Sequence, residues 1–210
     1  MKCASPDQTI NNARQFTASI DEGNAQMTIA DLVQQMSKAV ASSDPQAAVR
    51  AEMETLKGDL AGIAKMLDYL PGTGGNANQA FFRAPNLSLL KVSFPNGRRT
   101  PPHNHGTWAN ILVLSGSEKN TLYRRNADET LERDHEIVLT PGSLVTIPAN
   151  MAHVAECLGD EPAIGLHVYG ANVLGIDRLM WDPDTLQAHP LDWRKYEPLA
   201  LRASAMNGAP

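Results

Sequence analysis

The apolar positions in the first third of the chain follow the period of an α-helix. Steps of three and four residues predict a first helix with an apolar stripe of Ile29, Leu32, Val33, Met36 and Val40. Asp44 followed by Pro45 has the pattern of an N-cap and a first helical residue. The apolar stripe that follows, from Val49 to Leu67, predicts one helix that ends near Tyr69. A weaker pattern predicts a further helix over 7–21.

The pattern changes to short apolar runs separated by turn residues after about residue 80. Glycine and proline mark these turns, as in Pro141-Gly142. Short strands at this spacing are typical of a sandwich, a jelly roll or a barrel. The predicted strands cover 87–94, 110–115, 119–125, 136–140, 143–147, 153–158 and 162–169.

These patterns predict a single structural domain with three parts. A helical segment over 1–75 precedes a β-barrel over 76–175, on which the helices are expected to pack. The stretch after residue 175 is polar and bears prolines, so we expect 176–210 to be a tail packed on the barrel. The expected fold class is therefore mainly β with N-terminal α-helices.

Composition and charge narrow the function classes. The 210-residue chain is 42% hydrophobic and 20% charged, which is typical of a globular protein. Its formal net charge of −5 disfavours nucleic-acid binding, because contact with phosphates needs a basic surface. The sequence shows neither an apolar run long enough to span a membrane nor a secretory signal. Its two cysteines, Cys3 and Cys157, make no disulfide framework, so we expect a cytoplasmic protein without membrane partners.

Three histidines in the β-rich part carry the candidate chemistry. His103 and His105 are two residues apart, so on an extended segment both rings project from the same side. Their segment lies between Gly97 and Gly116, and a second turn-bounded block carries His153. Two such strand pairs can place three imidazoles around one metal ion inside a barrel.

The two blocks resemble the signature motifs of the cupin superfamily. The first motif has a glycine, a His-x-His pair, a glutamate and a second glycine, and here it reads GRRTPPHNHGTWANILVLSG. The second has a glycine, Pro-x-Gly, a histidine and an asparagine, and here it reads GSLVTIPANMAHVAEC. The resemblance covers residues 97–157 and implies a double-stranded β-helix, or jelly-roll barrel, with a metal held by His103, His105 and His153.

Departures from the two motifs indicate which branch of the superfamily the sequence resembles. Ala109 occupies the position of the glutamate ligand, Asn150 that of the motif glycine and Cys157 that of the asparagine. A cupin with three histidines and no carboxylate resembles the thiol dioxygenases, which act on cysteine or 3-mercaptopropionate. The phrase PPHNHGTWANILVLSG is similar to the bacterial members of that branch.

A later segment, GLHVYGANV, resembles the outer-sphere segment of thiol dioxygenases, in which serine, histidine and tyrosine alternate. His167 and Tyr169 match this pattern, and Gly165 stands where the serine would be. Because residues 163–169 alternate, these three share one face of a strand. If that face points into the barrel, His167 and Tyr169 are the catalytic residues that position oxygen.

The resemblance implies a non-haem Fe(II) enzyme that inserts both atoms of O2 into the sulfur of a small carboxylate-bearing thiol to give a sulfinate. Three neutral imidazoles leave a divalent metal with its full charge, which favours anionic ligands such as a thiolate, and iron accepts imidazole and sulfur. The resemblance also implies that Arg178 or Arg83 holds the substrate carboxylate, a role that suits the planar guanidinium. Trp108 is a candidate for the pocket wall, with core packing as the alternative.

Two other functions stay open at this point. Gly165 in place of serine favours a different metal-dependent cupin reaction, such as carbon–carbon cleavage by O2, decarboxylation or isomerisation. A non-catalytic metal-bound sensor or binding module, with the N-terminal helices as its interaction surface, is the third hypothesis. For the thiol dioxygenase hypothesis, the expected partners are a small thiol and O2. The protein is expected to be a monomer or a small homo-oligomer.

Overall fold

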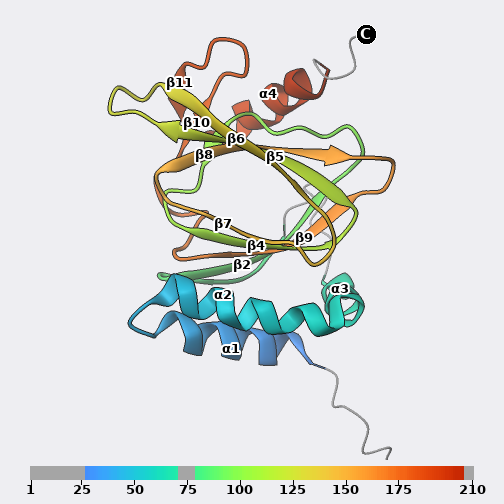
Figure 1. The fold of residues 1–210 in the computed structure, drawn as a ribbon. Coiled ribbons are helices and arrows are strands. Elements are labelled where there is room, and N and C mark those ends of the chain that lie inside the picture. Colours follow the sequence, from blue (N-terminus) through green and yellow to red (C-terminus); the bar gives the residue numbers. More distant parts are fainter. Residues whose placement is uncertain (1–26, 71–78, 206–210) are drawn as a thin grey trace, which may run out of the picture.

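A layer of helices lies on one side of the molecule (Figure 1). The computed structural model describes residues 27–70 and 79–205, so the helix expected over 7–21 lies outside the described residues. The first helix is confirmed and begins with a capping box at Thr28. The layer consists of α1 (Ile29–Val40), α2 (Pro45–Thr55), the 3-10 helix η1 (Leu56–Asp59) and α3 (Leu60–Asp68).

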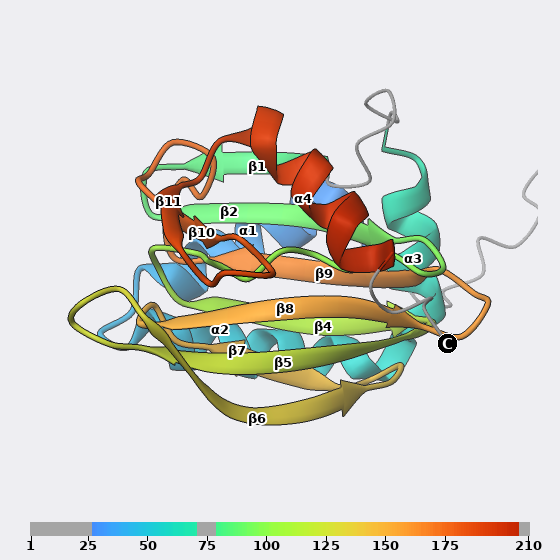
Figure 2. The same ribbon diagram turned by 90° about the horizontal axis from the view of Figure 1, so that it is seen from above.

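The prediction of one continuous helix from Val49 to Leu67 is wrong, because η1 interrupts it. The Asp59 carboxylate accepts a hydrogen bond from the Gly62 backbone N–H at 2.8 Å and so starts a new helix. The chain changes direction at this point, and α3 runs at an angle to α2 (Figures 1 and 2). Both helices keep their apolar residues in the same buried cluster, so the stripe persists across the break.

Two antiparallel sheets follow the helical layer along the chain. One sheet has the strand order β1–β2–β9–β4–β7, and the other has the order β11–β10–β3–β8–β5–β6. Each of the seven predicted strands is present, with ends shifted by up to five residues. The strands are β1 (Gln79–Ala84), β2 (Leu87–Phe94), β3 (His103–Asn104), β4 (Ala109–Ser115), β5 (Ser117–Arg125), β6 (Leu131–Leu139), β7 (Leu144–Ile147), β8 (Met151–Leu158), β9 (Ala163–Tyr169), β10 (Leu179–Trp181) and β11 (Ala188–Pro190).

The two sheets face each other and enclose the interior of a barrel (Figure 1). Alternation along β9 divides its side chains between two environments. Leu166 and Val168 pack in the cluster that the N-terminal helices cover, whereas Tyr169 belongs to the cluster between the sheets. The predicted fold class, a mainly β double-stranded β-helix with N-terminal helices packed on it, is confirmed.

The C-terminal stretch adds regular structure that the sequence pattern did not predict. β10 joins the six-stranded sheet by pairing with β3, and helix α4 (Trp193–Ala205) lies on the side of the molecule opposite α1 and α2 (Figures 1 and 2). Arg98 donates two hydrogen bonds to the Glu197 carboxylate, at 2.9 and 3.0 Å, which ties α4 to the barrel. The domain limits at 75 and 175 stay predictions.

Within the described ranges, none of the helices combines the length and the apolar character that a membrane crossing requires.

Candidate metal centre

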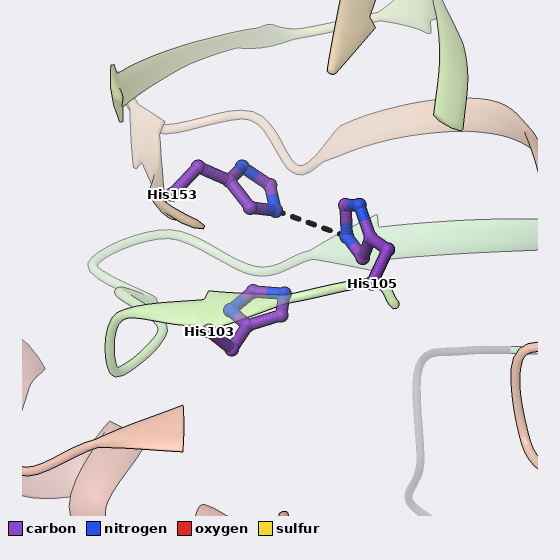
Figure 3. A group of neighbouring side chains, drawn as sticks. All are labelled: His103, His105 and His153. Atoms are coloured by element: carbon purple, nitrogen blue, oxygen red, sulfur yellow. Dashed lines mark hydrogen bonds between the residues drawn. The ribbon is translucent and has the colours of Figure 1, made fainter. Parts of the chain in front are cut away.

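Three histidine side chains converge between the sheets (Figure 3). β3 pairs with β8 so that His103 lies directly opposite His153, and His105 follows two residues after His103. All three are buried, and one ligand nitrogen from each ring lies within 4.8 Å of the other two. The Nε2 atoms of His105 and His153 are 3.2 Å apart. The structure therefore brings together the three residues that the motif spacing singled out.

Hydrogen bonds from the protein orient two of these rings. The His103 Nδ1 lies 3.0 Å from the Pro101 carbonyl oxygen, which can only accept, so Nδ1 carries the proton. The His153 Nδ1 lies 2.7 Å from the Asn120 Oδ1, which places a proton on that nitrogen as well. In both rings Nε2 is then left with a free lone pair, which is the form that binds a metal.

Burial keeps the histidines uncharged at neutral pH. It lowers the pKa of His103 to about 3, with a smaller contribution from the nearby Arg178 guanidinium. The pKa of His105 and that of His153 also lie well below the usual value, mainly through burial and then through repulsion from neighbouring rings. Neutral imidazole is the ligand form, so these pKa shifts favour metal binding over protonation.

The donor set fits a divalent metal ion. Metal–nitrogen bonds of about 2.1 Å hold neighbouring ligand nitrogens roughly 3 to 3.5 Å apart, and His105 and His153 already have such a spacing. Among the described residues, the buried Nδ1 of His105 has no hydrogen-bond partner, so a partner does not orient this ring in the way that Pro101 orients His103 and Asn120 orients His153. Ala109 is fully buried, and within the described residues the group contains histidines alone. Three protein ligands leave further coordination positions open to a substrate.

His167 and Tyr169 lie beside this group, as the alternation of β9 predicts. The His167 Nδ1 and the Tyr169 hydroxyl are 3.0 Å apart, and the Tyr169 and His105 ring centres are 5.0 Å apart. Burial lowers the pKa of His167 to about 3 and raises that of Tyr169 far above its usual value. The phenol therefore stays protonated and can act as a hydrogen-bond donor.

The His167 ring lies close to the backbone of Gly165. A Cβ atom at residue 165 would lie 3.0 Å from His167 Nε2, which is closer than ordinary van der Waals contact. A side chain at residue 165 would therefore require the His167 ring to shift by a few tenths of an ångström. Among the described residues, the buried His167 Nε2 has no hydrogen-bond partner. The outer-sphere group is a pair, His167 and Tyr169, and not a triad.

Arg178 also reaches the site. Its guanidinium donates to the carbonyl oxygens of Asn104 and Val173, at 3.0 and 3.3 Å, and lies over the Trp193 ring at 5.7 Å from its centre. Burial lowers the pKa of Arg178, and nearby phenols oppose this shift. No carboxylate of the described residues forms an ion pair with Arg178. A largely buried cation without a counter-ion is a favourable site for an anionic ligand.

These groups line a small cavity of about 60 Å³, which has room for a few water-sized groups. An open pocket of about 760 Å³ adjoins it, and the two share Val173, Leu174, Arg178 and Trp193. The inner cavity is lined by Ala80, Leu90, Val92, Phe94, His103, His105, His153, His167, Tyr169, Val173, Leu174, Arg178, Trp193 and Tyr196.

Two sequence candidates do not line this cavity. Arg83 is exposed on β1, and its position therefore does not support the expected contact with a substrate carboxylate. Trp108 packs against the helix-covered cluster and Gly170, as its core-packing alternative describes. Sequence reasoning missed Tyr196, whose ring centre is 5.6 Å from that of His103, because α4 was not predicted.

Part of the chain matches a known family. Residues 90–169 match the family model described as the cupin domain. Germin-like protein subfamily 1 member 19 of Arabidopsis thaliana is 30% identical over 118 residues, which are 50% of this chain and 52% of that protein. The chain therefore spans about half the length of the curated relative that it matches.

Solved structures with limited similarity include a cupin family protein and an oxalate decarboxylase. A RmlC-like cupin family protein with a double-stranded β-helix fold, from Methanocaldococcus jannaschii, has a TM-score of 0.40 and 12% identity, over 50% of this chain and 90% of that chain. Oxalate decarboxylase from Bacillus subtilis has a TM-score of 0.36 and 22% identity, over 42% of this chain and 22% of that chain. The family match over 90–169 and the two facing antiparallel sheets together support a place for this chain in the cupin superfamily.

Proposed function

We propose that this protein is an Fe(II)-dependent thiol dioxygenase that oxidises a small carboxylate-bearing thiol to a sulfinate. The observation that carries the proposal is the charge distribution in one cavity. Within the described part of the chain, three neutral histidines converge with no carboxylate in their group, and a guanidinium that forms no ion pair lines the same space. This arrangement favours a ligand with two negative groups, a thiolate at the metal and a carboxylate at Arg178.

The overall reaction balances without a further reductant. The thiol and one O2 molecule give one sulfinic acid, so both oxygen atoms end on sulfur and the sulfur supplies all four electrons. When bound, the iron supplies a positive centre at which a thiolate and O2 meet. Cysteine, 3-mercaptopropionate and similar compounds have the required pair of groups.

The residues of this chain have separate roles in the proposal. His103, His105 and His153 hold the metal through their neutral rings. Arg178 orients the substrate through its carboxylate. The protonated Tyr169 hydroxyl, held near His167, donates a hydrogen bond to oxygen in the cavity. Apolar side chains of β2 line the remaining wall and limit access of water.

Oxygen consumption tests the proposal directly. Fe(II)-loaded protein is mixed with cysteine, 3-mercaptopropionate, mercaptosuccinate or cysteamine, and uptake is followed with an oxygen electrode. We expect uptake with the thiols that bear a carboxylate, a sulfinate product by mass spectrometry, and little reaction with cysteamine. Free Fe(II) with each thiol is the control. Uptake no faster than this control with every thiol would contradict the proposal.

A different metal-dependent cupin reaction is the second candidate. It is favoured by Gly165 and by the buried His167 Nε2, which has no partner and is thus available to a different substrate. Carbon–carbon cleavage by O2, decarboxylation and isomerisation belong to this class. Turnover of a carboxylic acid substrate by the zinc- or nickel-loaded protein would support decarboxylation or isomerisation, because those metals do not support the iron oxygen chemistry.

A further inference from the structure

Two buried polar residues inside the barrel have no role in the function proposed above. On β5 the side chains of Glu118, Asn120 and Leu122 alternate with outward residues, and Leu122 packs in the cluster between the sheets. Glu118 is 3% exposed and Asn120 is 0% exposed. A carboxyl group at such a depth is costly to bury, so it needs specific partners.

These two residues connect to one metal ligand by a chain of hydrogen bonds. The Asn120 Nδ2 donates to the Glu118 Oε1 at 2.9 Å, and the Asn120 Oδ1 accepts from the His153 Nδ1 at 2.7 Å. By flipping, the Asn120 amide can present either its NH2 group or its oxygen to a neighbour, but the Glu118 carboxylate can only accept a hydrogen bond. Glu118 therefore decides which way Asn120 points.

The direction of this chain determines which nitrogen of His153 is free. With the amide oxygen toward the ring, the proton sits on Nδ1 and Nε2 faces His105 with a lone pair. If Asn120 flipped, its NH2 group would face Nδ1, the proton would move to Nε2, and the metal-binding lone pair would be lost. We propose that Glu118 acts through Asn120 as a positioning residue that locks His153 in its metal-binding tautomer.

When it is ionised, above about pH 7, the buried carboxyl group also adds a negative charge near the histidine group. The position of the usual glutamate ligand holds Ala109, so no carboxylate joins the described histidine group. Glu118 supplies an anion two hydrogen bonds away from His153, where it raises the basicity of the ring and does not occupy a coordination position. This inference rests on a metal at the three histidines, as the proposed function does, but not on the thiol or on O2.

Metal affinity tests the inference without turnover. The dissociation constant for Co²⁺ is measured by competition with a chelator, at about pH 8 so that the carboxyl group is ionised. Glu118→Gln keeps the shape of the side chain but can either donate or accept, so it removes the lock. We expect this variant to bind Co²⁺ about 10-fold more weakly, within the range known for groups that support metal ligands.

A second substitution provides a rescue. In the double variant Glu118→Gln/Asn120→Asp, the new carboxylate accepts directly from His153 Nδ1 and fixes the tautomer again. We expect its Co²⁺ affinity to return to within about threefold of that of the wild type. A role of Glu118 in folding alone would give no such recovery.

Asn110 supplies a matched control for loss of a buried amide. It is 0% exposed and hydrogen-bonds Gln46 and Thr146, away from the histidines. Asn110→Ala should keep the Co²⁺ affinity, whereas Asn120→Ala should lower it by about 10- to 100-fold. If the Asn120 variant fails to fold, the isosteric Glu118 variant and its rescue still decide the question.

Two results would overturn the inference: wild-type Co²⁺ affinity in Glu118→Gln, or no recovery in the double variant. Loss of Co²⁺ affinity in Glu118→Gln, together with inactivity of the Fe(II)-loaded wild-type protein toward every thiol, would reject the proposed reaction and leave the positioning role standing. Conversely, thiol oxidation by a Glu118→Gln enzyme with unchanged Co²⁺ affinity would reject only the positioning role.

Discussion

Acidification from about pH 7 to about pH 5.5 should destabilise the metal-free protein. Burial lowers the pKa of His103 and that of His167 to about 3, and it also depresses those of His105 and His153. In the unfolded chain each ring regains a pKa of about 6.5 and takes up a proton below that pH. Because the folded pKa values are depressed, the stability that the neutral rings provide is present above about pH 6.5 and lost as the pH falls below it.

The size of the effect follows from proton linkage. Proton uptake by the four histidines of the unfolded chain over this range costs about 5 kcal/mol in total. Glu118 opposes this loss, because burial raises its pKa from 4.5 to about 7. A raised folded pKa stabilises the protein at the lower pH, here by about 2 kcal/mol. The net loss is about 3 kcal/mol, a large part of a typical domain stability of about 5 to 15 kcal/mol.

Urea unfolding of chelator-treated protein, followed by tryptophan fluorescence at both pH values, measures this difference. Glu118→Gln serves as an internal check, because without the opposing carboxyl group the loss should grow to about 5 kcal/mol. Equal or greater stability at the lower pH would refute the reasoning that four neutral histidines are buried in the metal-free fold.

Three further predictions concern the site and the turns. His103→Ala should remove the metal and abolish oxygen uptake, whereas Tyr169→Phe should keep the metal and only slow turnover. Elemental analysis measures the metal, and an active His103 variant would contradict the ligand assignment. Arg178→Met should raise KM for 3-mercaptopropionate by about 10- to 100-fold, the loss of a charged hydrogen bond, and leave any residual cysteamine reaction unchanged. Gly116→Ala should lower the thermal stability far more than Gly97→Ala. Both glycines have positive φ, but only at Gly116 would a Cβ lie 2.3 Å from the Pro162 carbonyl oxygen. Equal losses in thermal unfolding would contradict this.

Seven of the described strands could be predicted, because alternation and turn residues are local signals. The other four, β1, β3, β10 and β11, were not predicted, and three of them are only two or three residues long, which is too short to show a period. The break between α2 and α3 could not be predicted, because the apolar period continues through Gly58 and Asp59 while the side-chain cap redirects the chain. α4 was missed because Pro198 lies inside it and its apolar residues bury against β10 and the barrel, a partner that no local pattern reveals.

The same difference between local sequence signals and the placement of distant residues applies to the site. The spacing of His103, His105 and His153 is tied to strand geometry, and the structure brings those residues together. Arg83 was chosen from the family resemblance, which does not determine the face of β1 on which this side chain lies. Asn120 could have been found, because it alternates with the apolar Leu122 on the strand predicted over 119–125, whereas Glu118 lies one residue before the predicted start of that strand.

Helix α4 forms part of the wall around His103 through Tyr196, and its bonds to the barrel come from Glu197 and Ser204. The same short helix therefore carries both a contact to a metal ligand and the ion pair that fastens it to the barrel. A substitution that breaks the pair between Arg98 and Glu197 should consequently also disturb the surroundings of His103, although neither of the two residues lines the cavity.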